Sequence, residues 1–119
     1  MLTTISDMIK GSGIFLCGQD CHPETFGVHT GDVSAVMLAD AGCSHVIVGH
    51  SERRISYSEK NELIRKKATT ALEAGLTAII CIGESEDQRN AGNTNDVILT
   101  QLSASLPPNS FSANIIIAY

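Results

Sequence analysis

Short apolar runs alternate along this chain with longer segments in which apolar residues recur at helical spacing. Most of the runs are rich in β-branched residues and bounded by glycine or polar residues, which is typical of strands buried on both faces of a parallel sheet. They predict four strands, at residues 14–17, 45–49, 77–83 and 115–118. The segments around them predict amphipathic helices, with apolar faces within residues 2–9, 36–41, 63–72 and 97–102.

Helix and strand follow one another with about 30 residues between strand starts, as expected for a series of βα units. This order predicts an α/β fold with about four parallel strands, right-handed crossovers and helices on the outside. We expect a single domain over residues 1–119, because no linker or low-complexity segment interrupts the pattern. Residues 19–32 read as a long polar loop, and loops of that length in compact domains are usually functional.

Local signals place the helix ends. Ser34 can cap the second helix, and Gly75 ends the third. Ser56-x-x-Glu59 resembles a capping box for the third helix, with Ser58 as a rival cap. The charged residues of this region are expected to form a solvated helix face: Glu59, Lys60, Glu62, Arg65, Lys66, Lys67 and Glu73.

Composition narrows the class of protein. Hydrophobic residues make up 43% of the chain and charged residues 18%, which is ordinary for a globular protein, and the absence of Trp predicts an aliphatic core with Met8 and Met37 as filling. The net charge of −5 argues against a nucleic-acid partner, which needs a basic face. No apolar run approaches a membrane span, and the first residues do not resemble a signal peptide, so we expect a cytoplasmic protein.

The cysteines and glycines give little support for a metal or a cofactor. Cys17 and Cys81 lie in strand-like runs, as reduced and buried intracellular cysteines do. Cys17-x₃-Cys21-His22 with His29 nearby is a possible metal cluster, but its spacing matches no standard zinc pattern. Gly11-x-Gly13 lacks the third glycine of a dinucleotide fingerprint and precedes its strand, and no Walker sequence is present.

The run Val46-Ile47-Val48-Gly49-His50-Ser51-Glu52-Arg53-Arg54 carries the clearest chemical signal. It places His50 at the carboxyl end of a buried strand, where parallel α/β folds carry their chemistry. The residues after His50 read as the first turn of a helix, whose free N–H groups and positive dipole end disfavour a protonated imidazole. A neutral imidazole there can donate a hydrogen bond to a carbonyl. Taken alone, however, a histidine at a strand end is more often a structural hydrogen-bonding group.

This run, Gly49-His50-Ser51-Glu52-Arg53-Arg54 in particular, resembles the triosephosphate isomerase family, and the similarity keeps its register over essentially the whole chain. Further segments that resemble the family are Thr30-Gly31-Asp32-Val33-Ser34, Asp40-Ala41-Gly42-Cys43, Cys81-Ile82-Gly83-Glu84, Gln88-Arg89-Asn90-Ala91-Gly92 and Ile117-Ala118-Tyr119. The resemblance implies part of a TIM (β/α)₈ barrel, from about the second helix to the sixth strand. A complete barrel takes about 250 residues.

The resemblance also implies an activity and the residues that carry it. The family interconverts dihydroxyacetone phosphate and glyceraldehyde 3-phosphate, in glycolysis and gluconeogenesis, as a homodimer without cofactor or metal. By resemblance His50 is the neutral histidine that polarises the substrate carbonyl. Ser51 and Glu52 would shape the site floor, and Cys81 would be structural. Thr30 and Gly31 would lie on the loop that inserts into the partner subunit. Asp20 departs from the asparagine usual in the family, at a position expected near the loop base and the interface.

Other groups of the family site match no residue of this sequence. The family's Asn-x-Lys pair would precede Met1, and its catalytic base glutamate, closing lid and phosphate loops would follow Tyr119. We therefore expect little or no isomerase activity from the 119 residues alone. The alternative is a non-catalytic remnant that self-associates or complements another fragment, with apolar positions such as Ile80 or Ile116 facing water or a partner.

Two arginines and a glutamate near His50 have a simpler interpretation. Arg53 and Arg54 suit an anion site, but we favour ion pairs with carboxylates such as Glu52 or Glu84. Glu84 itself is interpreted as a strand-end carboxylate paired with an arginine.

Overall fold

A parallel sheet forms the centre of the molecule in the computed structural model, which describes residues 1–108, 110 and 114–119. Its strands are β1 (Cys17–Gly18), β2 (His45–Val48), β3 (Thr77–Cys81) and β4 (Ile115–Ala118), and they pair in chain order. The predicted parallel sheet is thus confirmed. Its first strand is much shorter than predicted, because residues 14–16 lie outside it and Phe15 is 70% exposed.

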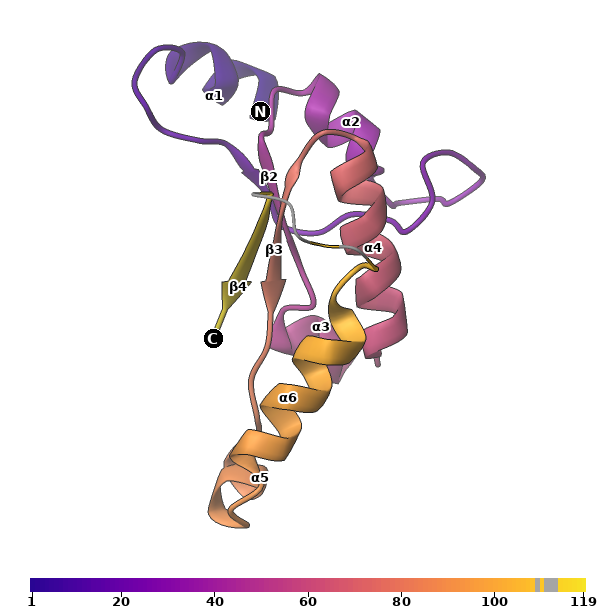
Figure 1. Ribbon diagram of the computed structural model, residues 1–119. Helices are drawn as coiled ribbons and strands as arrows, with labels where there is room; N and C mark the ends of the chain where they lie inside the picture. The colour runs from indigo at the N-terminus through magenta and orange to yellow at the C-terminus, as the bar shows by residue number, and fades with distance from the viewer. Residues whose placement is uncertain (109, 111–113) are drawn as a thin grey trace.

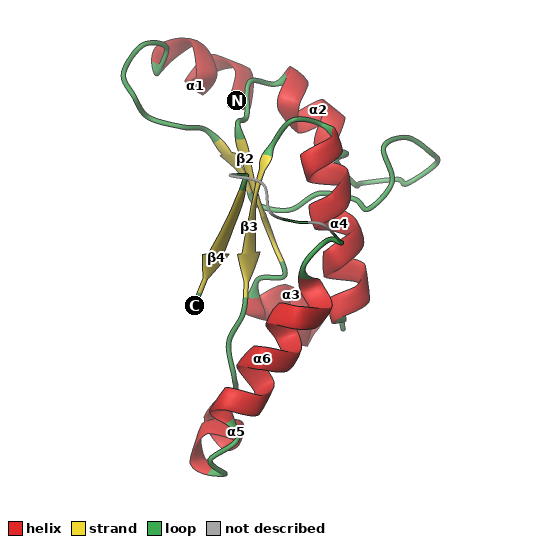
Figure 2. Cartoon of the chain, viewed as in Figure 1, coloured by secondary structure: helices red, strands yellow, loops and turns green. Residues whose placement is uncertain are grey.

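Six helices accompany the sheet in the described part of the chain. They are α1 (Leu2–Met8), α2 (Ala35–Asp40), α3 (Ser51–Ser56), α4 (Asn61–Glu73), α5 (Glu86–Asn90) and α6 (Thr94–Ser105). Figures 1 and 2 show α2, α4 and α6 gathered on one side of the sheet, while β4 ends the row of strands and leads to the C-terminus. Among the described helices, none has the length and apolar character needed to cross a bilayer.

The helix ends follow the predicted signals in part. Ser34 caps α2 by accepting a hydrogen bond from the N–H of Met37, as predicted, and Gly75 follows the end of α4 in the left-handed region at φ +78°. The predicted capping box is wrong, because α4 starts after Lys60 and neither Ser56 nor Ser58 caps it.

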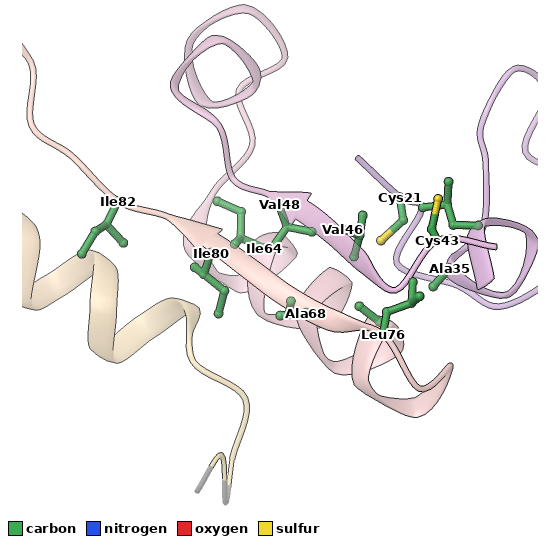
Figure 3. Close-up of a cluster of buried hydrophobic side chains, with 13 residues drawn as sticks. Cys21, Ala35, Cys43, Val46, Val48, Ile64, Ala68, Leu76, Ile80 and Ile82 are labelled. Carbon is green, nitrogen blue, oxygen red and sulfur yellow. The ribbon is translucent and has the colours of Figure 1, made fainter. Parts of the chain in front are cut away.

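The core lies between the sheet and α4 (Figure 3). Alternate residues of a strand point to opposite faces, and the helix-facing set from β2 and β3 is fully buried: Val46, Val48, Ala78 and Ile80. Ile80 was expected to face water or a partner, and that prediction is wrong, because its register with Val48 directs it toward the helices. Ile116 is 44% exposed, as predicted, since its register partner is Ile79 on the opposite face.

Several side chains differ from the predicted burial. Met8 and Met37 are exposed rather than core filling, and α2 instead contributes Ala35 and Leu38 to the core. All four cysteines are free. Cys21 and Cys43 are the buried ones, whereas Cys17 and Cys81 are only half-buried.

The charged face predicted for the third helix is also partly wrong, because Glu59 and Lys67 are buried. Lys67 Nζ donates to Glu59 Oε1 at 2.7 Å and to both carboxylate oxygens of Asp20 at 2.8 Å. Arg53 Nε lies 2.7 Å from Glu59 Oε1 and 2.9 Å from Asp20 Oδ2. Two acids and two bases therefore neutralise one another, which is what allows ionised groups to lie under the surface. This network ties the loop after β1 to α3 and α4.

Candidate functional site

His50 lies directly after β2 and is the N-cap residue of α3. Its ring Nδ1 accepts a hydrogen bond from the backbone N–H of Glu52 at 3.3 Å. Because a backbone N–H can only donate, Nδ1 carries no proton in this arrangement, and the neutral ring has its proton on Nε2. The Glu52 carboxylate oxygen Oε2 is farther from Nδ1, at 3.7 Å. In the neutral ring this contact leaves Nε2–H as a free donor.

Gly49 sets the direction in which the chain leaves β2. It adopts φ +72°, a region that disfavours residues with a Cβ. A Cβ built at this position would also lie 2.9 Å from Ile64 Cδ1 and 3.2 Å from Arg54 Nη2. The position therefore requires glycine for two independent reasons, and the turn that presents His50 depends on it.

The carboxyl ends of β2, β3 and β4 meet at a cavity of about 330 Å³. Its lining comprises Gly49, His50, Ser51, Arg54, Cys81, Ile82, Gly83, Glu84, Ala118 and Tyr119. His50 also borders a neighbouring cavity of about 430 Å³, together with Asp20, Glu52 and Arg53. The imidazole is 49% exposed and therefore accessible to a small molecule.

The residues predicted to support the site lie at different places around it. Ser51 and Cys81 line the same cavity as His50, whereas Glu52 borders only the neighbouring one and its side chain is 85% exposed. Burial raises the pKa of the Cys81 thiol, and the charge of Arg54 opposes this effect. A thiol with a raised pKa is a poor nucleophile at neutral pH, which fits a structural role.

Glu84 forms a second polar cluster at the rim of the cavity. Its side chain is 1% exposed, and Oε1 accepts hydrogen bonds from Arg89 Nε at 2.8 Å, from the Tyr119 hydroxyl at 3.1 Å and from Thr94 Oγ1 at 3.3 Å. The pKa of Glu84 is lowered, first by a hydrogen bond from its own backbone and then by Arg89. The predicted arginine pairing of Glu84 is confirmed, although its partner is Arg89 rather than Arg53 or Arg54.

Arg53 and Arg54 have different environments, which their adjacent positions in the sequence do not reveal. Arg53 forms ion pairs, as predicted, but with Asp20 and Glu59. Arg54 donates instead to the backbone carbonyls of Gly49 and Cys81 and to the side chain of Asn61. The preferred interpretation of Arg54 as an ion-pair partner is therefore wrong.

Thr30 and Gly31 lie on the loop between β1 and α2, and neither lines a cavity that contains His50. Both are exposed, and Gly31 adopts φ +90°. Within the same loop the rings of His22 and His29 stack with centroids 3.7 Å apart, and His29 Nε2 lies 3.0 Å from Glu24 Oε2. In the described part of the chain, no three His, Cys, Asp or Glu side chains converge to hold a metal ion.

Comparison with known proteins gives one consistent family. The family model for triosephosphate isomerase matches residues 1–119. Curated triosephosphate isomerases from Bradyrhizobium diazoefficiens and from Chelativorans sp. are 48% and 51% identical over 119 residues, which is all of this chain and 47% of each relative. The crystal structure of triosephosphate isomerase from Bartonella henselae matches with a TM-score of 0.96 and 47% identity, over 99% of this chain and 50% of that one. The chain thus spans about half the length of these relatives, and its four strands correspond to part of a TIM barrel.

Proposed function

Because this chain belongs to the triosephosphate isomerase family, we propose that it supplies the carbonyl-polarising half of a site that interconverts dihydroxyacetone phosphate and glyceraldehyde 3-phosphate. The observation that carries the proposal is the hydrogen bond from the Glu52 N–H to His50 Nδ1. It leaves Nε2–H as a donor at the mouth of a cavity where three strands end.

In the proposed reaction a base removes a proton from the carbon next to the substrate carbonyl. The electron pair left on carbon moves toward the carbonyl oxygen, and His50 Nε2–H donates a hydrogen bond to the oxygen as its negative charge grows. A donor aimed at developing charge stabilises the transition state more than the ground state. The hydroxyl proton on the neighbouring carbon is transferred to the former carbonyl oxygen, and the proton held by the base is returned to the former carbonyl carbon. A carbonyl thus forms at the neighbouring carbon, no cofactor is consumed and the atoms balance.

The base and the substrate lysine of the family have no counterpart in these 119 residues. General-base catalysis typically contributes about 10²–10⁴-fold to the rate. We therefore propose that activity requires both this chain and a segment carrying those groups. The free thiols fit a reducing compartment, so the proposed location is the cytoplasm, within glycolysis and gluconeogenesis.

We further propose that the loop bearing Thr30 and Gly31 forms the contact with a second subunit. Its exposed apolar residues, Phe26 and Val28, support a role in association. Asp20 at the base of this loop holds Lys67 and Arg53, and so links the loop to the segment that carries His50.

A second candidate is a non-catalytic remnant that only self-associates. The partly exposed strand β4 favours it, because Ile116 and Ile117 are 44% and 40% exposed at the edge of the sheet. Apolar residues on an open edge strand promote association with other chains.

A complementation assay separates the two candidates. The purified chain is mixed with a segment that supplies the missing strands, and isomerisation is followed by coupled oxidation or reduction of a nicotinamide. Activity that appears only on mixing, and that His50→Gln removes while His45→Gln retains it, supports the isomerase. His45 is a matched control because it begins the strand that leads to His50 and lies outside both cavities that contain His50. If the two segments associate and fold but the mixture shows no isomerisation, the result would support the non-catalytic remnant.

A further inference from the structure

The guanidinium of Arg54 joins three elements around the candidate site. Nε donates to the Gly49 carbonyl at 2.8 Å, Nη2 to the Cys81 carbonyl at 2.9 Å and Nη1 to Asn61 Oδ1 at 2.7 Å. These acceptors lie at the carboxyl end of β2, at the carboxyl end of β3 and at the first residue of α4. One planar group thus fixes the relative positions of two strand ends and a helix start.

Arg54 holds His50 from both sides along the chain. Its side chain binds the carbonyl of Gly49, the residue before His50, and its backbone N–H donates to the carbonyl of His50 itself at 3.0 Å. The peptide that enters His50 and the first turn that leaves it are therefore both tied to one residue. The space between Gly49 and Arg54 is tight, since a Cβ on Gly49 would approach Nη2 to 3.2 Å.

The charge of Arg54 is not neutralised by a carboxylate in the described part of the chain. The Arg and Lys ion pairs there involve Arg53, Lys67 and Arg89. Burial lowers the pKa of Arg54, with Cys81 and Glu59 opposing the effect, and an arginine remains charged at neutral pH in any case. An unpaired cation consequently lines the same cavity as His50.

We propose that Arg54 is a positioning residue for His50: its guanidinium fixes the peptide that enters His50, so that Nδ1 stays on the Glu52 N–H and Nε2–H faces the cavity. The role rests on the proposed function of His50 as the carbonyl-polarising group. Arg54 acts through the backbone and need not touch the substrate.

Arg65 provides a matched control for this role. It is also a half-buried arginine bound to backbone carbonyls, with Nε 2.8 Å from Ala104 O and Nη2 3.3 Å from Ser103 O. Those carbonyls lie near the end of α6, and Arg65 lines no cavity that contains His50. Its loss removes the same charge and similar hydrogen bonds without touching the turn at Gly49.

The experiment compares Arg54→Met with Arg65→Met in the 119-residue chain with its complementing segment present. Histidine labelled with ¹⁵N reports which ring nitrogen carries the proton at a pH of about 8, where an ordinary imidazole is neutral. We expect the unsubstituted chain and R65M to show His50 with its proton on Nε2 alone, and R54M to show a mixture of the two tautomers. In the complementation assay R54M should lower kcat by roughly tenfold or more, with a smaller change in KM.

The proposal is overturned if R54M keeps the single Nε2–H tautomer, or if its kcat falls no further than that of R65M. Should R54M fail to fold, Arg54→Lys and Arg65→Lys give the same comparison, because lysine keeps the charge but cannot reach three acceptors in a plane. Absence of activity in the unsubstituted mixture would instead count against the isomerase function, while the tautomer measurement would still decide the role of Arg54.

Discussion

Lys67 Nζ donates to Glu59 Oε1 at 2.7 Å, and the two side chains are only 4% and 3% exposed. An ion pair at this depth contributes little net stability compared with a well-packed apolar pair, but removing one partner leaves a buried charge without compensation. Arg53 and Asp20 share the same network, so the effect of one substitution reaches both the loop after β1 and the helix that begins at Ser51.

Substitution of Lys67 by Met should therefore lower the free energy of unfolding by roughly 3–5 kcal/mol. Two carboxylates would then share the single cation of Arg53. Lys66→Met is the matched control, because Lys66 is exposed on the same helix and should change the stability by less than about 0.5 kcal/mol. Urea unfolding of the complemented protein measures both values. Equal effects would contradict the structural importance of the buried network.

Stability should fall in acid partly through Glu59. Burial raises the pKa of this carboxyl, but hydrogen bonds from Lys67 and Arg53 outweigh burial and leave the pKa lowered. Since the folded-state pKa lies below the unfolded one, the contribution is fully present above the ordinary glutamate range of about pH 4.3 and is lost as the pH falls through the folded-state pKa. Glu59→Gln should flatten the loss of stability below that range. Because the pKa of Glu84 is also lowered, part of the dependence of stability on pH will remain in the variant. If stability falls with decreasing pH in E59Q as it does in the unsubstituted protein, Glu59 is not a source of the acid sensitivity.

Gly49→Ala should destabilise the protein more than Gly75→Ala. Both glycines adopt positive φ, at +72° and +78°, which costs a residue with a Cβ about 1–2 kcal/mol. Only at Gly49 does the new methyl group also meet close neighbours, with Ile64 Cδ1 at 2.9 Å, whereas nothing lies within 4 Å of a Cβ at Gly75. In thermal unfolding, the Tm of G49A should be lower than that of G75A. Equal changes in Tm would show that the turn at Gly49 has room to relax.

Cys21 should be the least reactive of the four thiols. It is 2% exposed, and burial together with the neighbouring Asp20 raises its pKa to about 12, so the reactive thiolate is scarce at neutral pH. Cys17 and Cys81 are half-buried and should react first with a disulfide reagent at a pH of about 8. In the reaction with the disulfide reagent, Cys21→Ser should remove a slow kinetic phase and leave the fast phases unchanged. Loss of a fast phase in that variant would show that Cys21 is accessible in the native state.

The isolated chain should be oligomeric or poorly stable. Ile116 and Ile117 on the edge strand β4 are substantially exposed, and β1 leaves the opposite edge of the sheet unpaired in the described residues. Sedimentation over a range of concentrations should detect association, and Ile116→Lys should weaken it. A monomer of uniform size with a cooperative transition at high temperature would contradict this expectation.

The sequence predicts β2, β3 and β4 well because their apolar runs are short, β-branched and ended by turns. It misplaces the first strand and the burial of Met37 because an apolar residue has the same signature whether it contacts this chain, another chain or solvent. The network of Glu59 and Lys67 escapes prediction for a different reason. Charged residues spaced along a helix usually indicate a solvated face, and the decisive partner, Asp20, lies 47 residues from Lys67.

The candidate site also contains one part that the sequence predicts and another that it does not. His50 is predictable because a strand, a glycine and a helix start coincide at one place in the sequence. The contacts of Arg54 are not predictable, because two of its three acceptors are backbone carbonyls and one of these, at Cys81, lies 27 residues away. Backbone acceptors have no residue type and therefore leave no signal in a sequence.

Within the described sheet, strands that are neighbours in the chain are also neighbours in the sheet. A ribosome releases the amino-terminal part first, so each new strand meets an edge that has already been made. No strand of this sheet needs to wait for a distant segment before it finds its neighbour. Growth of the sheet can thus proceed in step with synthesis, one βα unit at a time.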